Sequence, residues 1–408
     1  MIPKIFVCAD WYLPGYKAGG PVSSISNLIE LLGEQFHFYV FTRDRDLTET
    51  SPYSGVCFDR WVSVGKAQVF YTSNLSIRNL RRRVLEVAPD IIYLNSFFSR
   101  LTVKTLLLRR LGFLPPSAIV LAPRGEFSPG ALNLKPFRKW IYLNTALRAG
   151  LCRDLLWEAS SSLEKEHICA AAIRNGNRDS GGVQIAPHLP SPHLFQQPSP
   201  LSKPEKWPGA ARFVFLSRIS RMKNLHFALD VLASIAGHIV FDIYGPADDS
   251  TYWKACCDRI RALPNNISVN YGGSVPREDV HEKLAQYHFF VLPTLGENFG
   301  YVILEALSAG CPLLISDQTP WRDLPAKGVG WDLPLDNRER WRQVVQECVD
   351  MNQEAYQSLS ERARRYAQES SSSTSYQEDI LQLFRQALER SSARKSSESL
   401  ERSAEITG

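Results

Sequence analysis

The sequence predicts an α/β protein with two doubly wound domains whose parallel sheets face a common cleft. Short apolar runs alternate with helical patterns along the chain, which is typical of parallel strands joined by crossover helices. A length of 408 residues favours two or three domains. Six prolines between positions 188 and 208 indicate an interdomain linker. We therefore expect domains at 1–190 and 209–372, joined by a linker at 191–208.

The amino-terminal domain begins with an apolar run that is too short and too soon interrupted for a signal peptide. We interpret that run as a first buried strand. Helical patterns follow at 23–32, 77–87 and 101–111. The predicted strands of this domain are 5–9, 36–42, 68–72, 91–94, 118–121 and 183–186.

The carboxy-terminal domain repeats the alternation, with a first helix predicted at 225–236. Its predicted strands are 213–217, 239–244, 267–271, 289–292 and 313–316. A closing helix is expected at 373–390. Because serine and charged residues dominate after that point, we expect a disordered tail at 391–408.

Composition restricts the classes of function. The formal charge of +5 and pI near 8.7 favour acidic ligands or membrane surfaces. The sequence contains no recognised nucleic-acid-binding module and no apolar run near the roughly 20 residues of a membrane span. The eight cysteines lack C-x-x-C spacing and the histidines are not grouped with them, which argues for reduced thiols and against zinc. We therefore expect a cytoplasmic protein.

The segment from Leu295 to Gly310 is the most informative motif. It follows the strand predicted at 289–292 and contains Glu297 in a loop and Glu305 on the second turn of an apolar helix. The amino end of a helix attracts anions, because its first N–H groups are unpaired and its dipole is positive there. A nucleotide-sugar diphosphate is an anion that fits such a site.

This segment resembles the E-x7-E signature of retaining family-4 glycosyltransferases with the GT-B fold, which has two Rossmann-like domains. The resemblance implies that Glu297 contacts hydroxyls of the transferred sugar and that Glu305 contacts the ribose hydroxyls. It also implies that the amides near Phe299, Gly300 and Tyr301 stabilise the diphosphate.

A second motif follows the strand at 213–217. The resembled family carries Gly-Arg…Lys-Gly here, and Arg218 and Lys223 match its two cations, whereas Ser217 and Asn224 replace the glycines. Fixed cations stabilise the negative charge that develops on a departing nucleoside diphosphate. With Glu297, these two residues are the expected catalytic group. The alternative for the cations is solvated surface.

The first strand leads into a glycine-rich loop in which Gly19 and Gly20 precede a helix. The loop lacks the spacing of dinucleotide-binding and P-loop motifs. By resemblance it lies against the donor phosphate and the acceptor, with Lys17 as a further candidate for acceptor or phosphate contact. A plain tight turn remains the alternative.

The loop after strand 118–121 carries Arg124-Gly125-Glu126, where many relatives of the resembled family have a histidine-containing loop. It resembles a subset of bacterial polysaccharide-assembly transferases. Arg124 is a candidate for binding a phosphate or acidic sugar and Glu126 for binding acceptor hydroxyls, and a salt-bridged loop is the alternative for both. The serines before Glu164 are expected to be helix caps, and Asp44 and Asp46 to be surface residues.

A basic amphipathic stretch at 135–153 interleaves lysine and arginine with apolar side chains. It suits peripheral contact with anionic lipid on the inner face of the plasma membrane, or an ordinary helix with one buried face.

The sequence thus predicts a hexosyltransferase-type enzyme of the family-4 kind. The expected donor is a UDP- or GDP-sugar, and the expected acceptor is a glycan or lipid-linked molecule of bacterial cell-surface polysaccharide biosynthesis. Neither a metal nor another cofactor is expected, because the cations replace the metal. The alternatives are an inactive GT-B scaffold or sugar-nucleotide-binding protein, or a sugar-nucleotide epimerase. A glycogen-type phosphorylase would need a pyridoxal-binding lysine context that the sequence lacks.

Overall fold

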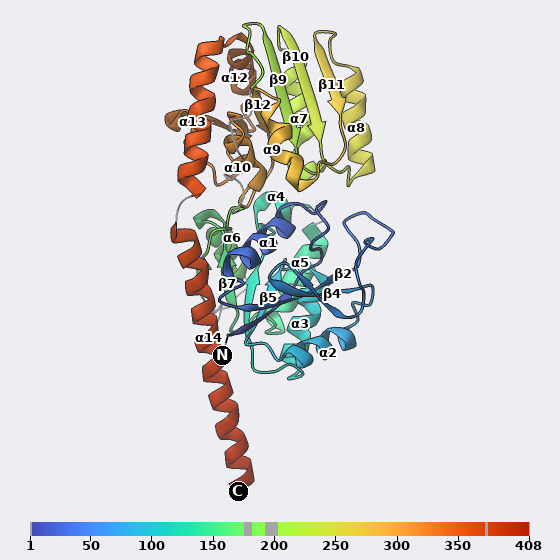
Figure 1. The fold of residues 1–408 in the computed structure, drawn as a ribbon, viewed down its shortest axis with the longest axis vertical. Helices are drawn as coiled ribbons and strands as arrows, with labels where there is room; N and C mark the ends of the chain where they lie inside the picture. The colour runs from blue at the N-terminus through green and yellow to red at the C-terminus, as the bar shows by residue number, and fades with distance from the viewer. Residues whose placement is uncertain (1, 135, 175–181, 192–202, 372–373, 408) are drawn as a thin grey trace. The chain divides into compact units, whose positions relative to one another are not determined.

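A computed structural model describes residues 2–134, 136–174, 182–191, 203–371 and 374–407. The chain forms two compact units (Figure 1). Unit 1 comprises Met1–Leu189 and Thr374–Gly408, and unit 2 comprises Pro190–Ser373. Both are α/β units with predominantly parallel sheets, which confirms the predicted fold class.

The sheet of unit 1 has the strand order β3-β4-β2-β1-β5-β6-β7-β8. All pairs are parallel except β3 with β4. The predicted strands are present, and β3 and β7 are additional. The strands are β1 (Lys4–Cys8), β2 (His37–Arg43), β3 (Trp61–Val64), β4 (Ala67–Thr72), β5 (Ile91–Asn95), β6 (Ala118–Ala122), β7 (Leu156–Ala159) and β8 (Val183–Ile185).

Helices cover both faces of this sheet. One core cluster joins the sheet to α1 (Gly20–Leu32) and α14 (Thr374–Thr407). The other joins it to α2 (Ile77–Val87), α3 (Arg100–Arg110), α5 (Pro136–Arg148) and α6 (Ser162–Arg174). The short helix α4 (Pro129–Leu132) lies in the connection between β6 and α5.

The final helix differs from the prediction in length. Its first part packs against β5 and β6 of unit 1, as the expected closing helix would. It then continues to Thr407, whereas the sequence predicted a helix at 373–390 followed by a disordered tail. Serine and charged residues disfavour burial, but alanine, arginine, lysine and glutamate are also good helix formers. Low apolar content therefore did not mark the end of this helix.

The sheet of unit 2 is entirely parallel, with the order β11-β10-β9-β12-β13-β14. The five predicted strands are present and β14 is additional. The strands are β9 (Ala210–Leu216), β10 (His238–Tyr244), β11 (Ile267–Tyr271), β12 (Phe289–Leu292), β13 (Leu313–Ser316) and β14 (Gly330–Leu333).

The helices of unit 2 pack on its sheet around one continuous apolar core. Two short 3₁₀ turns, η1 and η2, precede α7 and α9. The predicted helix at 225–236 ends earlier, at Leu232. The helical elements are η1 (Arg221–Lys223), α7 (Leu225–Leu232), α8 (Ser250–Arg261), η2 (Arg277–Asp279), α9 (Val280–Ala285), α10 (Tyr301–Ser308), α11 (Leu324–Lys327), α12 (Arg338–Asp350) and α13 (Gln353–Ser371).

The end of the predicted linker is fastened to unit 2. Residues 192–202 lie outside the described part of the chain, but 203–208 are described. The ammonium group of Lys203 donates to the carbonyl oxygen of Tyr287 at 2.6 Å, and that of Lys206 donates to the carbonyl oxygens of Val349 and Met351, both at 2.8 Å. These contacts set the point at which the chain joins unit 2.

Within the described ranges, no helix is both long enough and apolar enough to span a bilayer.

Candidate functional site

Strand order places the two predicted motifs of unit 2 side by side. From β9 the chain moves outward through β10 and β11, then crosses to β12 and continues outward on the other side. The order therefore reverses between the neighbouring parallel strands β9 and β12. Open α/β sheets bind ligands at such a reversal, outside the carboxyl ends of the strands. The loops after β9 and β12 are those that carry the Arg218–Lys223 and Glu297 motifs.

The loop after β9 presents one exposed cation and one buried cation. Arg218 has a side chain that is 42% exposed, and its Nη1 lies 3.5 Å from Oδ2 of Asp248. Burial raises the pKa of the Asp248 carboxyl, and Arg218 opposes that shift. Lys223 is buried at the end of η1. Asn224 has φ of 58°, a left-handed conformation that asparagine tolerates, whereas Ser217 does not adopt it.

Direct contacts hold the two loops together. The amide of Leu295 donates to the carbonyl oxygen of Met222 at 2.7 Å, and the Thr294 hydroxyl donates to the same oxygen at 3.1 Å. Lys223 forms an ion pair with Glu297. Both charged side chains are largely buried. The structure thus brings together the residue that we expect to bind the diphosphate and the residue that we expect to bind the sugar.

Helix α10 begins directly beyond this ion pair. Its N-cap is Gly300 with φ of 79°, a conformation that strains any residue with a Cβ. A Cβ at position 300 would lie 2.7 Å from Cδ1 of Ile303 and 3.1 Å from Cγ of Glu297. Trp321 Nε1 donates to the carbonyl oxygen of Phe299 at 2.6 Å, and the Phe299 and Tyr301 rings are 4.8 Å apart. The loop therefore holds the positive end of the helix dipole in a defined position.

Glu305 lies on the second turn of α10, as predicted. Burial raises the pKa of its carboxyl to about 7, and nearby Arg277 opposes the shift. Near neutral pH the group is therefore present in both protonation states. Either state can form hydrogen bonds with hydroxyl groups of a ligand.

The glycine-rich loop of unit 1 lies after β1, also at a reversal of strand order, since β2 and β5 flank β1. Gly19 has φ of 67°, and Gly20 is the first residue of α1. Lys17 forms an ion pair with Glu49 on the unit's own surface. The left-handed conformation explains the glycine at position 19 as a turn requirement.

The prediction that Asp44 and Asp46 are surface residues is wrong, because both are buried. Asp46 Oδ2 accepts hydrogen bonds from the amides of Tyr16 and Lys17 at 2.9 and 3.1 Å. Its carboxylate therefore holds the glycine-rich loop from a position 30 residues away in the sequence. Burial of such an acceptor is tolerated when donors satisfy it.

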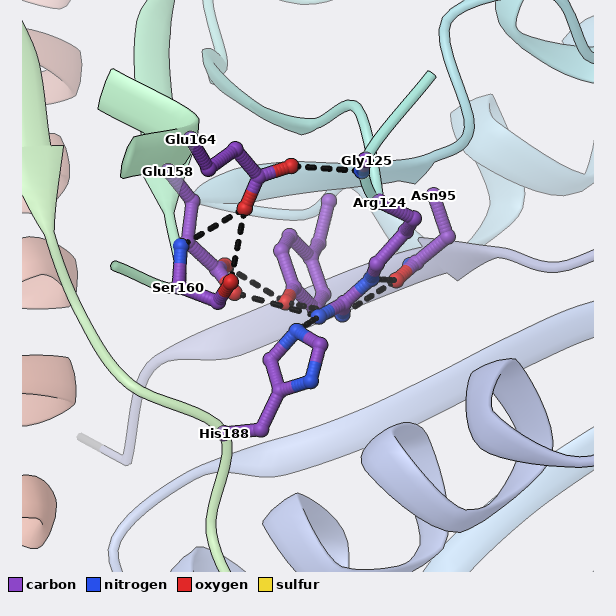
Figure 2. Close-up of polar contacts among 8 residues, drawn as sticks. Asn95, Arg124, Gly125, Glu158, Ser160, Glu164 and His188 are labelled. Atoms are coloured by element: carbon purple, nitrogen blue, oxygen red, sulfur yellow. Dashed lines mark hydrogen bonds and ion pairs between the residues drawn. The ribbon is translucent and has the colours of Figure 1, made fainter. Parts of the chain in front are cut away.

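Arg124 lies within a buried polar network at the carboxyl edge of the unit 1 sheet, shown in Figure 2. Its guanidinium donates to Oδ1 of Asn95 at 2.6 Å and to the Tyr93 hydroxyl at 2.7 Å, and contacts Oε1 of Glu158 at 3.3 Å. It also contacts Nε2 of His188. Burial, together with the Arg124 charge, holds the pKa of His188 well below its usual value, so this histidine is neutral. The guanidinium of Arg124 is thus engaged within the unit.

The carboxylates of Glu126 and Glu164 hold the loop that contains Arg124. Glu126 accepts from the Ser96 hydroxyl at 2.6 Å and from the Phe97 and Phe98 amides at 2.6 and 3.1 Å. Burial raises the pKa of Glu126, and these donors oppose the shift. Figure 2 shows Glu164 between Gly125 and Ser160, whose amides donate to it at 2.6 and 2.7 Å. The predicted capping role holds for Ser161, whose Oγ accepts from the Glu164 amide at 3.2 Å.

The predicted site residues thus divide between the units. In unit 2, Lys223 and Glu297 form an ion pair beside the start of α10, whereas Arg218 pairs with Asp248. The candidates in unit 1 follow β1 or β6 and lie in a loop or, for Gly20, at the first residue of α1. The unit's own contacts hold both loops. These candidates are Lys17, Gly19, Gly20, Arg124 and Glu126. Among the described residues, no group of three or more His, Cys, Asp or Glu side chains is arranged to hold a metal ion.

Sequence reasoning missed Asp248, Trp321 and His188 as neighbours of the site residues. Each belongs to a loop after a strand, at sequence distances of 30, 22 and 64 residues from Arg218, Phe299 and Arg124 respectively. The available signal was their position directly after a predicted strand, because parallel strands bring such positions to one edge.

Comparison with known proteins gives a family match in the carboxy-terminal half of the chain. Residues 201–366 match the model of the family glycosyl transferases group 1, a range that includes both loops of the unit 2 site. No curated protein shows significant sequence similarity to the chain.

Solved structures of GT-B glycosyltransferases share the fold along nearly the whole chain. Anabaena HepE, solved with UDP and glucose, has 16% identity and a TM-score of 0.65, covering 94% of this chain and 100% of that chain. Sucrose-phosphate synthase from Thermosynechococcus elongatus has 14% identity and a TM-score of 0.68, covering 94% and 98%. WaaG, a glycosyltransferase involved in lipopolysaccharide biosynthesis, has 14% identity and a TM-score of 0.63, covering 93% and 98%. This chain therefore has the GT-B fold.

Proposed function

We propose that this protein is a retaining glycosyltransferase that moves a sugar from a nucleotide-sugar donor to a glycan or lipid-linked acceptor. The observation that carries the proposal is the ion pair of Lys223 with Glu297, which joins two loops at the strand-order reversal of unit 2. The first of these loops also carries the exposed Arg218. The match of residues 201–366 to a glycosyl transferase family supports it. So does the similarity to GT-B enzymes, two of whose structures contain UDP with glucose or UDP-glucose.

The proposed roles follow from charge and position. Arg218 and Lys223 hold the diphosphate and stabilise the negative charge that grows as the glycosidic bond to it breaks. The amino end of α10, at Phe299, Gly300 and Tyr301, adds the field of the helix dipole. Glu297 binds hydroxyls of the transferred sugar, and Glu305 binds the ribose hydroxyls.

The ion pair between Lys223 and Glu297 gives these roles a physical basis. Two charges that are largely buried hold each other in place, so neither side chain has to reorganise greatly when a ligand arrives. A diphosphate that approaches Lys223 weakens the attraction between the pair and leaves Glu297 with acceptor capacity for sugar hydroxyls. In this proposal donor binding thus prepares the sugar-binding carboxylate.

The finer proposals are assignment to family 4, retention of anomeric configuration and catalysis without a metal ion. In the proposed mechanism the acceptor hydroxyl attacks on the face from which the diphosphate leaves. The donor is a UDP- or GDP-sugar, and the pathway is bacterial cell-surface polysaccharide biosynthesis. The similarity to WaaG, which is involved in lipopolysaccharide biosynthesis, supports that pathway.

The alternative is a catalytically inactive GT-B protein that binds a sugar nucleotide or scaffolds an assembly complex. The presence of Arg218, Lys223, Glu297 and Glu305 together argues against it, because a scaffold does not need all four. An enzyme releases nucleoside diphosphate from its donor in the presence of acceptor, whereas a scaffold does not.

A thermal-shift experiment with UDP, GDP, ADP and dTDP tests the donor site. We expect one nucleotide to raise the melting temperature of the wild-type protein selectively, and Lys223→Ala to abolish that shift. Arg221→Ala is the matched control, because Arg221 lies in the same loop with a 58% exposed side chain paired to Asp249. Absence of a shift with every nucleotide, or an equal shift in Lys223→Ala, would contradict the proposed site.

A further inference from the structure

Helix α5 presents an apolar stripe to solvent. Its inner face is buried through Leu143, Ala146 and Leu147. Phe137, Trp140 and Ile141 are 71%, 61% and 43% exposed, although the first two are among the largest apolar side chains. At 3.6 residues per turn, Phe137, Ile141 and Arg148 lie along one line of the helix surface. This helix therefore has a second apolar face, which the described residues of unit 1 leave exposed.

The stripe is held rigidly in place. Lys139 turns back to donate to the carbonyl oxygen of Ala131 in α4 at 2.7 Å, and its ammonium lies 5.1 Å from the centre of the Phe98 ring. The Tyr142 hydroxyl donates to the carbonyl oxygen of Phe97 at 3.4 Å. These contacts fix the rotation of α5 about its axis, so the exposure of Phe137 and Trp140 is a property of the fold.

Three helices of the layer that contains α5 are strongly basic. Helices α2, α3 and α5 pack on the same face of the unit 1 sheet, and Figure 1 shows them in one part of that unit. Glu86 is the only acidic residue in these three helices, and it pairs with Arg83. The exposed basic residues of the three helices are Arg78, Arg81, Arg82, Arg100, Arg110, Arg138 and Arg148.

Exposed apolar side chains collect on this same layer. Besides the α5 stripe, it exposes Ile77 and Leu85 on α2 and Leu107 on α3, with Leu111 and Phe113 just beyond α3. The ends of α3 and α5 are joined, because Arg110 Nε donates to the carbonyl oxygen of Ala149 at 3.3 Å. Basic and apolar groups thus share one layer of helices.

We propose that the α2–α3–α5 layer docks on an anionic lipid bilayer, with Phe137, Trp140 and Ile141 entering the interface. Aromatic and apolar side chains among arginines are suited to the boundary between headgroups and acyl chains. A second copy of this chain is disfavoured as the occupant, because pairing the layer with itself would place like charges together. A bilayer supplies both the acyl region and the phosphate charge.

The position of the stripe gives docking a consequence that rests on the proposed function. Helices α4 and α5 follow directly on the Arg124–Glu126 loop at the carboxyl edge of the unit 1 sheet. A protein docked through α5 holds that edge close to the lipid surface. The acceptor of the proposed transfer is then a lipid-linked molecule rather than a free glycan.

Cosedimentation of the full chain with vesicles tests the docking. We expect binding to phosphatidylcholine vesicles that contain phosphatidylglycerol, weak binding to phosphatidylcholine alone, and loss of binding at high salt. The variant Phe137→Ser/Trp140→Ser/Ile141→Ser should lower the partition coefficient at least about tenfold. Each of Arg82→Gln, Arg138→Gln and Arg148→Gln should lower it roughly fivefold.

Trp207→Ser is the matched control, because Trp207 belongs to unit 2 and is 62% exposed, against 61% for Trp140. It should leave vesicle binding unchanged. Equal binding by the triple serine variant, no binding by the wild-type protein, or equal binding to both vesicle types would overturn the docking proposal. So would self-association of the wild-type protein in light scattering that the triple serine variant abolishes.

The docking proposal and the proposed function can be contradicted independently of each other. The triple serine variant should keep the nucleotide-dependent rise in melting temperature, because its substitutions all lie in unit 1. Vesicle binding without any nucleotide response would contradict the proposed function and leave the docking proposal in place. A nucleotide response without vesicle binding would contradict the docking proposal and leave the proposed function in place.

Discussion

The carboxyl edges of the two sheets both gather charged side chains, but they use them differently. In unit 1, Arg124 and Glu158 are almost fully buried, and their polar atoms contact each other and residues of the neighbouring strand β5. In unit 2, Arg218 is 42% exposed and its nearest carboxylate, on Asp248, lies 3.5 Å away. Charge at a strand end therefore does not identify a ligand site. Accessibility and the number of neighbouring polar partners distinguish Arg124, a structural cation, from Arg218, which is open to an anionic ligand.

Among the variants that test this difference between the two edges, Arg124→Met should cause the largest loss of stability. The substitution leaves Glu158 buried without its cation, and breaking such a pair costs about 3–5 kcal/mol. Burial already raises the pKa of Glu158, so removing the cation favours its protonated form further. We expect the urea concentration at the midpoint of unfolding to fall in proportion to this loss of free energy.

Two further variants sharpen that test. Arg124→Met/Glu158→Gln should recover part of the lost stability, because it removes the unpaired carboxyl as well. Arg218→Ala should lower the free energy of unfolding by less than about 1 kcal/mol, as expected for an exposed pair. Equal losses at Arg124 and Arg218 would remove the distinction between the two edges.

Lys223→Met should lower catalysis strongly, and it should also lower stability, because it leaves the largely buried Glu297 without its cation. Removing one fixed cation that stabilises developing charge lowers kcat/KM roughly 10²–10³-fold. Steady-state release of nucleoside diphosphate is the measurement, with Arg221→Ala as the control that stays near wild type. A Lys223→Met enzyme with normal kcat/KM would place the lysine outside the reaction.

Gly300→Ala tests the loop between Glu297 and α10. A Cβ at a φ of 79° is strained, and it would lie 3.1 Å from Cγ of Glu297. We expect a stability loss of about 1–2 kcal/mol, together with a weaker response to nucleotide. Gly55→Ala is the control, because Gly55 has φ of 72° with no atom within 4 Å of the added Cβ. If nucleotide raises the melting temperature of both variants as much as that of wild type, the space beside Glu297 is not needed for nucleotide binding.

Glu305→Gln should produce the smallest change, which is a change in how the free energy of unfolding depends on pH. The folded pKa of Glu305 is raised from 4.5 to about 7, so the folded state binds more protons than the unfolded state between these values. Its contribution to stability is fully present below pH 4.5 and is lost as pH rises through about 7. The difference in unfolding free energy between wild type and Glu305→Gln should therefore fall across this window. A constant difference would show that the pKa of Glu305 is not raised.

The sequence predicted local features well, because local patterns determine them. Alternating apolar runs located most of the strands, and the order of strand, loop and apolar helix located Glu297 and Glu305. It missed β14 (Gly330–Leu333), where glycine and aspartate weaken the strand signal, and β3 (Trp61–Val64), a half-exposed antiparallel edge strand. It also missed β7 (Leu156–Ala159), a buried strand in which Glu158 interrupts the apolar run.

The roles of Asp46, Arg124 and Glu126 depended on contacts that no local pattern contains. Asp46 reaches the amide of Tyr16, 30 positions earlier, and Arg124 reaches His188, 64 positions later. Charge and a position near a strand end made these residues look like surface or ligand-binding groups. Only the fold shows that neighbouring loops already use them.

The central claim is that the unit 2 site acts on a nucleotide sugar, and Arg218→Ala tests it most directly. Release of nucleoside diphosphate is measured from a panel of UDP- and GDP-sugars, with membrane lipid extract as the source of acceptor, for wild type, Arg218→Ala and Arg221→Ala. We predict turnover of one donor by wild type and Arg221→Ala, and a loss of roughly 10²-fold or more in Arg218→Ala. Turnover that survives Arg218→Ala unchanged would contradict the assignment of this site.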